Sequence, residues 1–356
     1  MIKNNLYDKS LLVVTPDGYV NSEMKATKPT GTSFTFSRGS TNVSYIGKNG
    51  YLKKVVSDTN VPRLDYSLGV PAFMIEGSST NLAPYSNIES AGYTSSGNAT
   101  ITENATNSPE NALNASLITG DNSDYVYSAS IAVTQGDLYT KSIYIKNINS
   151  SESKIDFENV GYSFNIQWNG ETLSAITNHN NPTKQTVKYD YLKDGWYRVY
   201  VTELTTGSSS IVKIYPSVGG SSGTISCYGV QLELGELSSL IHNSNSSNTR
   251  LQETNSYSIN LPTTGTICCF TGGTSAGVMS VLGESFTPSA EENKIAIAYS
   301  ATNLNISLNG RIVLKKAGTY DVTSLSTLSL GQGNLHKAFY FIDEFLMDSE
   351  LNDITD

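Results

Sequence analysis

The chain has 356 residues, of which 15% are charged and 22 are tyrosine, and its net charge is −9. This length suits two or three domains, each able to bury a core. The acidic balance, with no cluster of Lys and Arg, argues against a nucleic-acid partner, because neutralising phosphates needs clustered cations. Abundant Ser, Thr, Asn and Gly beside many tyrosines favour an all-β protein with many turns.

The charge is unevenly spread along the sequence. Lys plus Arg against Asp plus Glu count 9 against 6 in residues 1–82, 9 against 15 in residues 83–250, and 5 against 11 in residues 251–356. The first segment therefore carries +3 and the remainder −12. This asymmetry suggests that the N-terminal end meets a different partner from the body of the protein.

Residues 1–33 hold only one short apolar run, at residues 11–14, followed by a stretch rich in Lys, Thr, Pro and Gly. This run is too short for a secretory signal, and no segment approaches the roughly 18 apolar residues of a membrane span. We expect a soluble protein made without export, whose residues 1–33 form an extended anchor arm ordered by a partner or by neighbouring copies. The alternative is a tail that packs on its own body.

Residues 34–86 are predicted to form a small hairpin module and a connector. Apolar pairs at residues 45–46 and 51–52 flank a turn that contains Asn49-Gly50, and both of these residues tolerate positive φ. The following stretch, residues 61–86, carries three prolines, one short apolar run and a polar exit, which is typical of a connector with fixed contacts.

Four charged residues of this module are expected to hold it together. Arg38, Arg63 and Asp65 suit charge-assisted hydrogen bonds between the hairpin and the connector, and Glu76 lies in the same connector. We interpret all four as a structural junction. A catalytic role for Asp65 or Glu76 is the minor interpretation.

Residues 87–250 are predicted to form a two-sheet β-sandwich. Alternating apolar residues and Gly-containing turns indicate seven or eight short strands at intervals that suit a sandwich or jelly roll. The expected strands cover residues 125–127, 138–145, 163–168, 188–192, 196–203, 210–218 and 226–234.

Residues 251–356 are predicted to form a second, smaller β-sandwich that ends in one short helix. A capping residue, Asp348 or Ser349, is expected to start that helix. Three cysteines are too few for a disulfide framework, and the adjacent pair Cys268-Cys269 is expected to point to opposite faces of a strand. The expected strands cover residues 267–270, 278–282, 294–299, 304–308, 312–314 and 338–345.

Several short strings resemble a series that recurs in virion proteins of tailed bacteriophages. They are Phe36-Ser37-Arg38-Gly39-Ser40-Thr41, Tyr45-Ile46-Gly47 to Gly50-Tyr51-Leu52, Pro62-Arg63-Leu64-Asp65-Tyr66, Met74-Ile75-Glu76-Gly77-Ser78-Ser79-Thr80-Asn81-Leu82, Gly195-Trp196-Tyr197-Arg198-Val199, Gly229-Val230-Gln231-Leu232-Glu233-Leu234-Gly235 and Asn248-Thr249-Arg250. The resemblance covers roughly residues 34–356 and implies a fibre, tail-associated protein or head decoration. A carbohydrate-binding-module-like β-sandwich follows the first strings in such proteins.

The C-terminal segment resembles the concanavalin A-like, or laminin-G-like, jelly roll that often comes next in those proteins. The similar strings are Ile306-Ser307-Leu308-Asn309-Gly310, Leu328-Ser329-Leu330-Gly331 and Asp348-Ser349-Glu350-Leu351. This segment is short for such a domain and has no clustered Asp and Asn ligands for calcium.

Catalytic motifs are missing from the sequence. The three histidines, His179, His242 and His336, are far apart and none lies in a metal or nucleophile motif. No P-loop, dinucleotide fingerprint or nucleophile elbow occurs. Glycoside hydrolysis needs only two carboxylates about 5–10 Å apart, so a polysaccharide depolymerase stays open as a minor alternative. We expect no enzymatic activity, no cofactor and no metal.

A glycan-binding surface is the stronger expectation for this sequence. Sugars bind flat aromatic faces beside planar polar groups, and Trp168 lies next to the turn Asn169-Gly170. The candidate surface consists of Trp168, Tyr162, Tyr189, Tyr191 and Asn178, with His179 and Asn180 beside it. The alternative is that a Trp or Tyr on a sandwich strand belongs to the core, and Trp196 is assigned to the core.

The sequence thus predicts a non-enzymatic phage structural protein, made in the host cytoplasm and located on the virion surface. The preferred role is a head fibre or capsid-decoration subunit that attaches through residues 1–33 to other virion proteins, such as the capsid, and displays its sandwiches to host or mucosal surface glycans. A homo-oligomer, dimer or trimer, is expected because linked copies add avidity. The alternatives are a tail fibre, receptor-binding or adaptor protein, and a tail-associated depolymerase.

Overall fold

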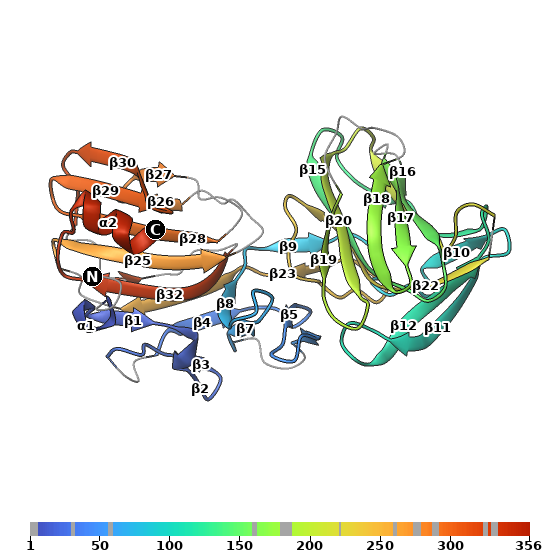
Figure 1. The fold of residues 1–356 in the computed structure, drawn as a ribbon, viewed down its shortest axis with the longest axis horizontal. Coiled ribbons are helices and arrows are strands. Elements are labelled where there is room, and N and C mark those ends of the chain that lie inside the picture. Colours follow the sequence, from blue (N-terminus) through green and yellow to red (C-terminus); the bar gives the residue numbers. More distant parts are fainter. Residues whose placement is uncertain are drawn as a thin grey trace. The chain divides into compact units, whose positions relative to one another are not determined.

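A computed structural model describes residues 6–29, 33–55, 60–158, 162–178, 187–220, 222–258, 262–272, 279–286, 292–322, 327–328 and 334–356. It is an all-β protein with short helices near its two ends, which confirms the predicted fold class. The chain divides into two compact units, each built from separated stretches (Figure 1). Unit 1 comprises Met1–Gly39, Ser57–Ser78 and Leu251–Asp356, and unit 2 comprises Ser40–Val56 and Ser79–Arg250.

Unit 2 is a β-sandwich of two antiparallel sheets. The first has the order β11 (Thr100–Asn107), β12 (Leu113–Gly120), β22 (Gly223–Leu234), β15 (Leu138–Asn147), β20 (Tyr197–Leu204) and β19 (Lys188–Tyr191). The second has the order β10 (Tyr93–Ser96), β13 (Tyr125–Ser128), β21 (Ser209–Tyr215), β16 (Glu152–Glu158), β17 (Tyr162–Asn169) and β18 (Thr172–Asn178), with β14 (Ile131–Ala132) beside β21. Alternating apolar residues of both sheets, such as Ile143 and Val199 from one and Phe157 and Phe164 from the other, form one core.

The predicted hairpin belongs to unit 2. Its strands are β5 (Ser44–Ile46) and β6 (Leu52–Lys54), and Gly50 in the turn has φ of 80°, as the Asn-Gly signal requires. Leu52 is buried with Tyr144, Trp196 and Tyr228 of the sandwich, so Trp196 is a core residue as predicted. A second small ribbon pairs β9 (Ser79–Asn81) with β23 (Asn248–Arg250).

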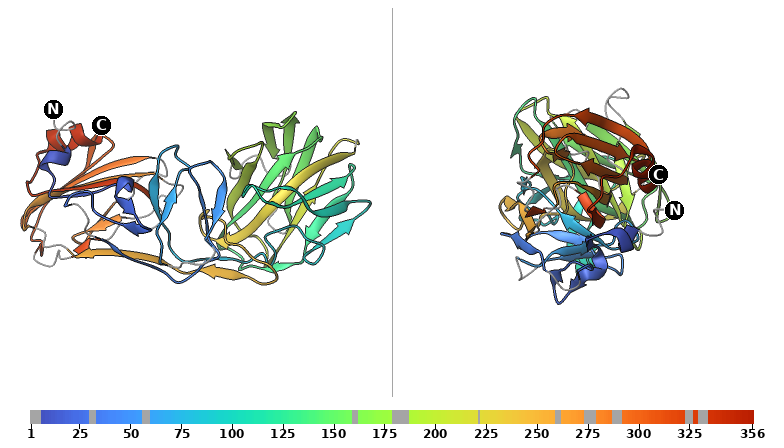
Figure 2. Two further views of the ribbon diagram at one scale, coloured as in Figure 1. Left: turned by 90° about the horizontal axis from the view of Figure 1, so that it is seen from below. Right: turned by 90° about the vertical axis from the view of Figure 1, so that its left-hand side faces the viewer.

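Unit 1 is built on one eight-stranded sheet. Its order is β30 (Arg311–Ala317), β29 (Asn303–Leu308), β28 (Asn293–Tyr299), β25 (Gly265–Gly272), β32 (Asn334–Ile342), β8 (Ala72–Ile75) and β7 (Arg63–Asp65), with β1 (Leu12–Val14) beside β32. The short helices α1 (Leu6–Lys9) and α2 (Asp348–Thr355) pack on one face of this sheet (Figure 2). Cys268 faces these helices while Cys269 faces the opposite core, and both thiols are free, as predicted.

The opposite face of that sheet carries the larger core of unit 1. A three-stranded sheet covers it, with the order β31 (Thr327–Leu328), β24 (Glu253–Ser258) and β4 (Thr35–Arg38). The turn η2 (Pro16–Gly18), the ribbon β2 (Tyr19–Val20) with β3 (Glu23–Met24), and the hairpin β26 (Met279–Val281) with β27 (Glu284–Phe286) complete the unit. Phe34, Phe36 and Met24 pack here against Phe73 and Ile75.

Two expectations differ from the structure in detail. The described part of the predicted arm is folded into unit 1, because β1 pairs with β32 and its residues Leu12 and Val14 are buried in the core. This is the alternative given above, a segment that packs on its own body. The final helix is capped by Met347, whose backbone N–H donates to Glu350, and not by Asp348 or Ser349.

Candidate functional site

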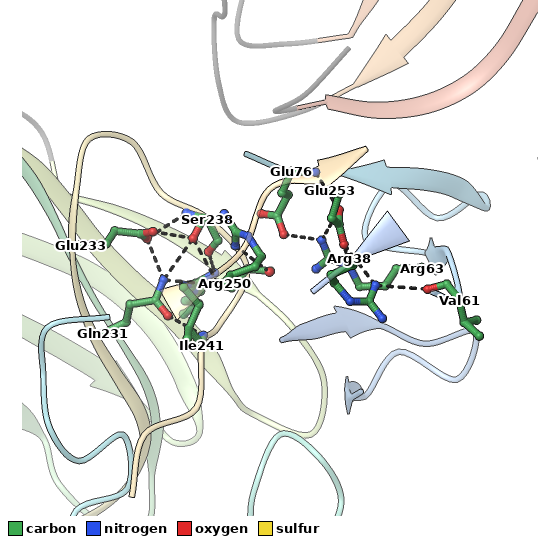
Figure 3. A network of polar contacts seen from close by, with 12 residues as sticks. Arg38, Val61, Arg63, Glu76, Gln231, Glu233, Ser238, Ile241, Arg250 and Glu253 are labelled. Atoms are coloured by element: carbon green, nitrogen blue, oxygen red, sulfur yellow. Dashed lines mark hydrogen bonds and ion pairs between the residues drawn. The ribbon is translucent and has the colours of Figure 1, made fainter. Parts of the chain in front are cut away.

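Four charged residues form a buried network inside unit 1 (Figure 3). Strand pairing places Glu253 of β24 directly opposite Arg38 of β4, and the Arg38 Nη1 atom lies 3.1 Å from Glu253 Oε1. Arg63 of β7 binds the same carboxylate through two nitrogens, at 3.0 Å from Nε and 2.8 Å from Nη2. Its Nη2 atom also lies 2.6 Å from Glu76 Oε2, so the network holds two cations and two anions.

The network is shielded from water, and each of its four side chains contacts a side chain of opposite charge. The side chains of Arg38 and Glu253 are 0% exposed and that of Arg63 is 1% exposed. Burial alone would lower the pKa of Arg63, but the carboxylates of Glu253 and Glu76 outweigh it and raise that pKa. The backbone N–H of Glu76 donates to Glu253 Oε2 at 2.8 Å. Arg38, Glu76 and Glu253 each lie within three residues of a point where the chain leaves unit 1, so the network fixes these ends.

The predicted junction was therefore incomplete without Glu253. Arg38, Arg63 and Glu76 are brought together as expected, and Asp65 accepts a hydrogen bond from the backbone N–H of Ser67 at 2.8 Å. Only the register of β24 against β4 identifies Glu253, since it lies far from the other three residues in the sequence. No local pattern around residue 253 in the sequence points to this role.

Unit 2 holds a separate buried polar network built from other quoted strings (Figure 3). The Glu233 carboxylate accepts from Gln231 Nε2 at 2.7 Å, from the Ser238 backbone N–H at 2.9 Å and from Ser79 Oγ at 2.7 Å. Asn81 donates to the carbonyls of Val230 and Ile241, and it accepts from backbone N–H groups. Asn81 and Glu233 thus bind main-chain groups of β22 and of the loop after it, which indicates a structural role.

His242 contacts a serine and a glutamate without forming a catalytic triad. Its Nε2 atom lies 2.7 Å from Ser44 Oγ and 3.3 Å from Glu110 Oε1. A triad needs a different ring nitrogen for each partner, and Ser44 is fully buried. Burial, with a smaller effect of Lys54, lowers the pKa of His242 to about 3, so the ring is neutral near pH 7.

Acid should destabilise unit 2 through His242. The unfolded chain takes up the proton near the ordinary pKa of 6.5, whereas the folded ring does so only near pH 3, so stability is lost as pH falls through that window. For this one group, linkage gives a loss of about 2 kcal/mol between pH 7 and pH 5. Urea unfolding followed by tryptophan fluorescence reports unit 2, because Trp168 and Trp196 both lie there. His242→Gln should remove most of that loss, and an unchanged pH dependence would contradict the assignment.

Cys269 and His336 form a further contact between a thiol and an imidazole. Burial raises the pKa of Cys269 to about 12, so the contact of its thiol with His336 Nδ1, at 3.8 Å, is not that of an activated nucleophile. Within the described ranges, no group of three or more His, Cys, Asp or Glu side chains is arranged to hold a metal ion. In the same part of the chain, no helix is long and apolar enough to cross a membrane.

An aromatic cluster lies at the edge of unit 2, where β19 ends one sheet. Tyr189 and Tyr191 are 47% and 60% exposed, and both rings meet Tyr197 edge-on, with centroids 6.0 and 5.3 Å away. Trp168 of the other sheet packs against Tyr197 from the interior at 6.1 Å. The cluster thus offers two exposed tyrosines on a rigid aromatic base.

The predicted glycan surface is only partly assembled. Trp168 differs from the expectation, since it is 8% exposed and its Nε1 atom donates to Ser153 Oγ at 2.9 Å. It belongs to the core, the alternative stated above. Tyr162 and Asn178 lie on β17 and β18, but their side chains are outside what the structure describes, as are residues 179–186 with His179 and Asn180.

No protein-family model and no curated protein matches this chain. The assignment of a function therefore depends on the geometry and on the strings quoted above.

Proposed function

We propose that the protein is a non-enzymatic structural protein of a tailed-phage virion. The preferred role is a head fibre or capsid-decoration subunit that forms a dimer or trimer and presents unit 2 to surface glycans. The observation that carries glycan attachment is the exposed pair Tyr189 and Tyr191, held on Tyr197 at a sandwich edge. Exposed tyrosines on a rigid base supply apolar ring faces and hydroxyl groups at low entropic cost, which is what sugar binding requires.

The positions of the quoted strings in the structure support the proposed phage resemblance. Several of their charged and amide residues take part in the two internal polar networks, as with Arg38, Arg63 and Glu76 in unit 1 and Asn81 and Gln231 in unit 2. A recurring string whose residues form an internal polar network preserves the fold, while the exposed residues can differ between proteins. That division suits a family of display proteins with different ligands.

Attachment to other virion proteins is assigned to the N-terminal segment. Although its described part is folded into unit 1, three apolar side chains remain exposed there: Tyr7 at 49%, Leu11 at 48% and Val20 at 46%. These side chains are the surface that the segment offers to a capsid protein or to a second copy.

The glycan part of the proposal is tested by binding to a glycan array. Wild-type protein should bind at least one surface glycan, and the double variant Tyr189→Ala/Tyr191→Ala should bind it about tenfold more weakly or not at all. Val313→Ala is the control, because this side chain is 48% exposed and lies on β30 of unit 1, outside the N-terminal segment. Binding that is absent, or unchanged in the double variant, would reject the Tyr189 and Tyr191 edge.

The virion part of the proposal is tested by mass spectrometry of purified particles. Peptides of this protein should be detected in particles that have been purified on a density gradient. Its absence from them would refute the assignment. A location on the tail would favour the alternative, a tail fibre, receptor-binding or adaptor protein, and release of new reducing ends from host polysaccharide would favour a depolymerase.

A further inference from the structure

The outward face of the seven-stranded sheet in unit 2 carries an ordered set of aromatic and polar side chains. Phe157 of β16, Phe164 of β17 and Val212 of β21 point into the core. Because side chains alternate along a strand, the residues on either side of each of them face outward. One row across the strands follows direct pairing from Tyr127 to Lys213, Asp156 and Ser163. The next row runs from Tyr215 to Lys154, Asn165 and Thr177, with Tyr125 beside Tyr215.

Three tyrosines form a continuous aromatic platform on this face. The ring centroids of Tyr125 and Tyr215 are 4.8 Å apart and those of Tyr125 and Tyr127 are 5.8 Å apart, and all three side chains are half-buried. Lys154 Nζ lies 4.8 Å from the centroid of Tyr215, and Lys213 Nζ lies 5.4 Å from that of Tyr125. The lysines are only half-buried, and such long side chains can move away from a ring when a ligand arrives.

Two polar groups next to this platform have unused hydrogen-bonding capacity. Among the described residues, the side-chain oxygens Asn165 Oδ1 and Ser163 Oγ have no hydrogen-bond partner, although the two residues are only 3% and 2% exposed. Asn165 is already oriented, because its Nδ2 atom donates to Glu152 Oε1 at 2.7 Å. Buried polar atoms without a partner are costly, so a ligand hydroxyl at these positions would be favoured.

The balance of charge on this face selects the ligand class. Lys213 pairs directly with Asp156, and Glu152 and Lys154 lie on the same face of β16, so these described residues supply as many carboxylates as ammonium groups. A nucleic acid or a polyanionic chain would meet these carboxylates, which disfavours it. Ring faces, an amide and a hydroxyl fit a neutral ligand with many hydroxyl groups.

We infer that this face is a second carbohydrate-binding site, which takes a neutral polysaccharide chain across β13, β21, β16 and β17. The rings of Tyr125 and Tyr215 hold the apolar faces of the sugar units, while Asn165 Oδ1 and Ser163 Oγ accept hydrogen bonds from sugar hydroxyls. The inference extends the proposed glycan attachment, and it does not use Tyr189 or Tyr191. Two separate sites in one chain would add avidity within each subunit.

Affinity electrophoresis of the full-length protein tests the inference. Separate gels contain dextran, laminarin, galactomannan or xylan, and one gel contains alginate as the polyanion. At least one neutral polysaccharide should slow the wild-type protein, and Tyr125→Ala/Tyr215→Ala should weaken that binding by about tenfold. The matched control is the double variant Tyr189→Ala/Tyr191→Ala. Neutral polysaccharide should still slow this variant at least in part, and the remaining retardation should be lost when Tyr125→Ala/Tyr215→Ala is added.

A second variant keeps the test decisive if the double substitution fails to fold. Thr177 is exposed on β18 and pairs directly with Asn165, so Thr177→Arg should obstruct the face without disturbing the core. Loss of retardation in a folded Thr177→Arg protein would support the site. The inference is overturned if no neutral polysaccharide slows the protein, if alginate alone does so, or if retardation survives both variants. Failure here with Tyr189-dependent binding intact would leave the proposed function standing.

Discussion

Replacing Glu253 by alanine is expected to destabilise unit 1 by ~3–5 kcal/mol, because it leaves two arginines buried without their shared carboxylate. Arg38 and Arg63 both bind Glu253, and the side chains of all three are at most 1% exposed. The 2.6 Å contact between Arg63 and Glu76 does not replace the carboxylate that both arginines share. A loss of this size is a large part of the stability of an ordinary domain.

The cysteines of the chain allow each unit to be followed by itself. Cys268 and Cys269 are buried in unit 1 and Cys227 is buried in unit 2, so thiol labelling under native conditions reports the opening of each. Glu253→Ala should accelerate labelling of Cys268 and Cys269 and leave Cys227 unaffected. Glu292→Ala, which removes an exposed carboxylate paired with Lys337, is the matched control and should change stability by less than about 1 kcal/mol. Equal labelling rates in both variants would argue against the network.

Replacing Glu203 by alanine is expected to cost unit 2 a similar ~3–5 kcal/mol, since it leaves Lys141 charged and unpaired inside the sandwich. Lys141 Nζ lies 2.8 Å from Glu203 Oε1, and the side chains are 0% and 5% exposed. Burial lowers the pKa of Lys141 despite the attraction of Glu203. Its ammonium group also lies 5.4 Å from the ring centroid of Phe157 in the facing sheet.

The double variant Lys141→Met/Glu203→Leu tests whether the buried ion pair stabilises unit 2 more than apolar side chains in the same space would. It fills the same space with apolar groups, so its stability should return to within about 1–2 kcal/mol of the wild-type protein or exceed it. Urea unfolding monitored by the two tryptophans measures the whole cycle in unit 2. The surface pair Lys315 and Asp348 of unit 1 provides the comparison, followed by thiol labelling of Cys268 and Cys269, with single substitutions expected to cost less than about 1 kcal/mol. Additive losses in the double variant would contradict this account of the pair.

Much of the fold was predictable because apolar alternation marks strands with one buried face. The strands expected at residues 138–145 and 196–203 correspond to β15 and β20, and the Asn49-Gly50 hairpin has the expected pairing. In unit 2 the strands β10, β11, β12, β14, β16 and β18 were not predicted. β11 reads TITENATN and has no buried residue, so its pairing with β12 provides the order that its own sequence does not indicate.

The candidate sites were less predictable, because they depend on register between distant segments. Arg38, Arg63 and Glu76 were identified from their place in one connector, but Glu253 joins them only through the pairing of β24 with β4. Trp168 reads as an exposed residue beside a turn, yet the second sheet buries it against Tyr197. The Tyr125 and Tyr215 platform arises from the pairing of β13 with β21, which no local pattern reveals.

The central claim, a protein displayed on the surface of a phage particle, is tested most directly by locating it there. A Fab fragment would be raised against the recombinant full-length protein and selected for binding to unit 2. Purified particles labelled with this Fab would be imaged by cryo-electron microscopy. The account predicts Fab density on the head, repeated at symmetry-related positions, with dimeric or trimeric subunits beneath it. Particles that contain no copy of the protein, and no Fab density on head or tail, would contradict it.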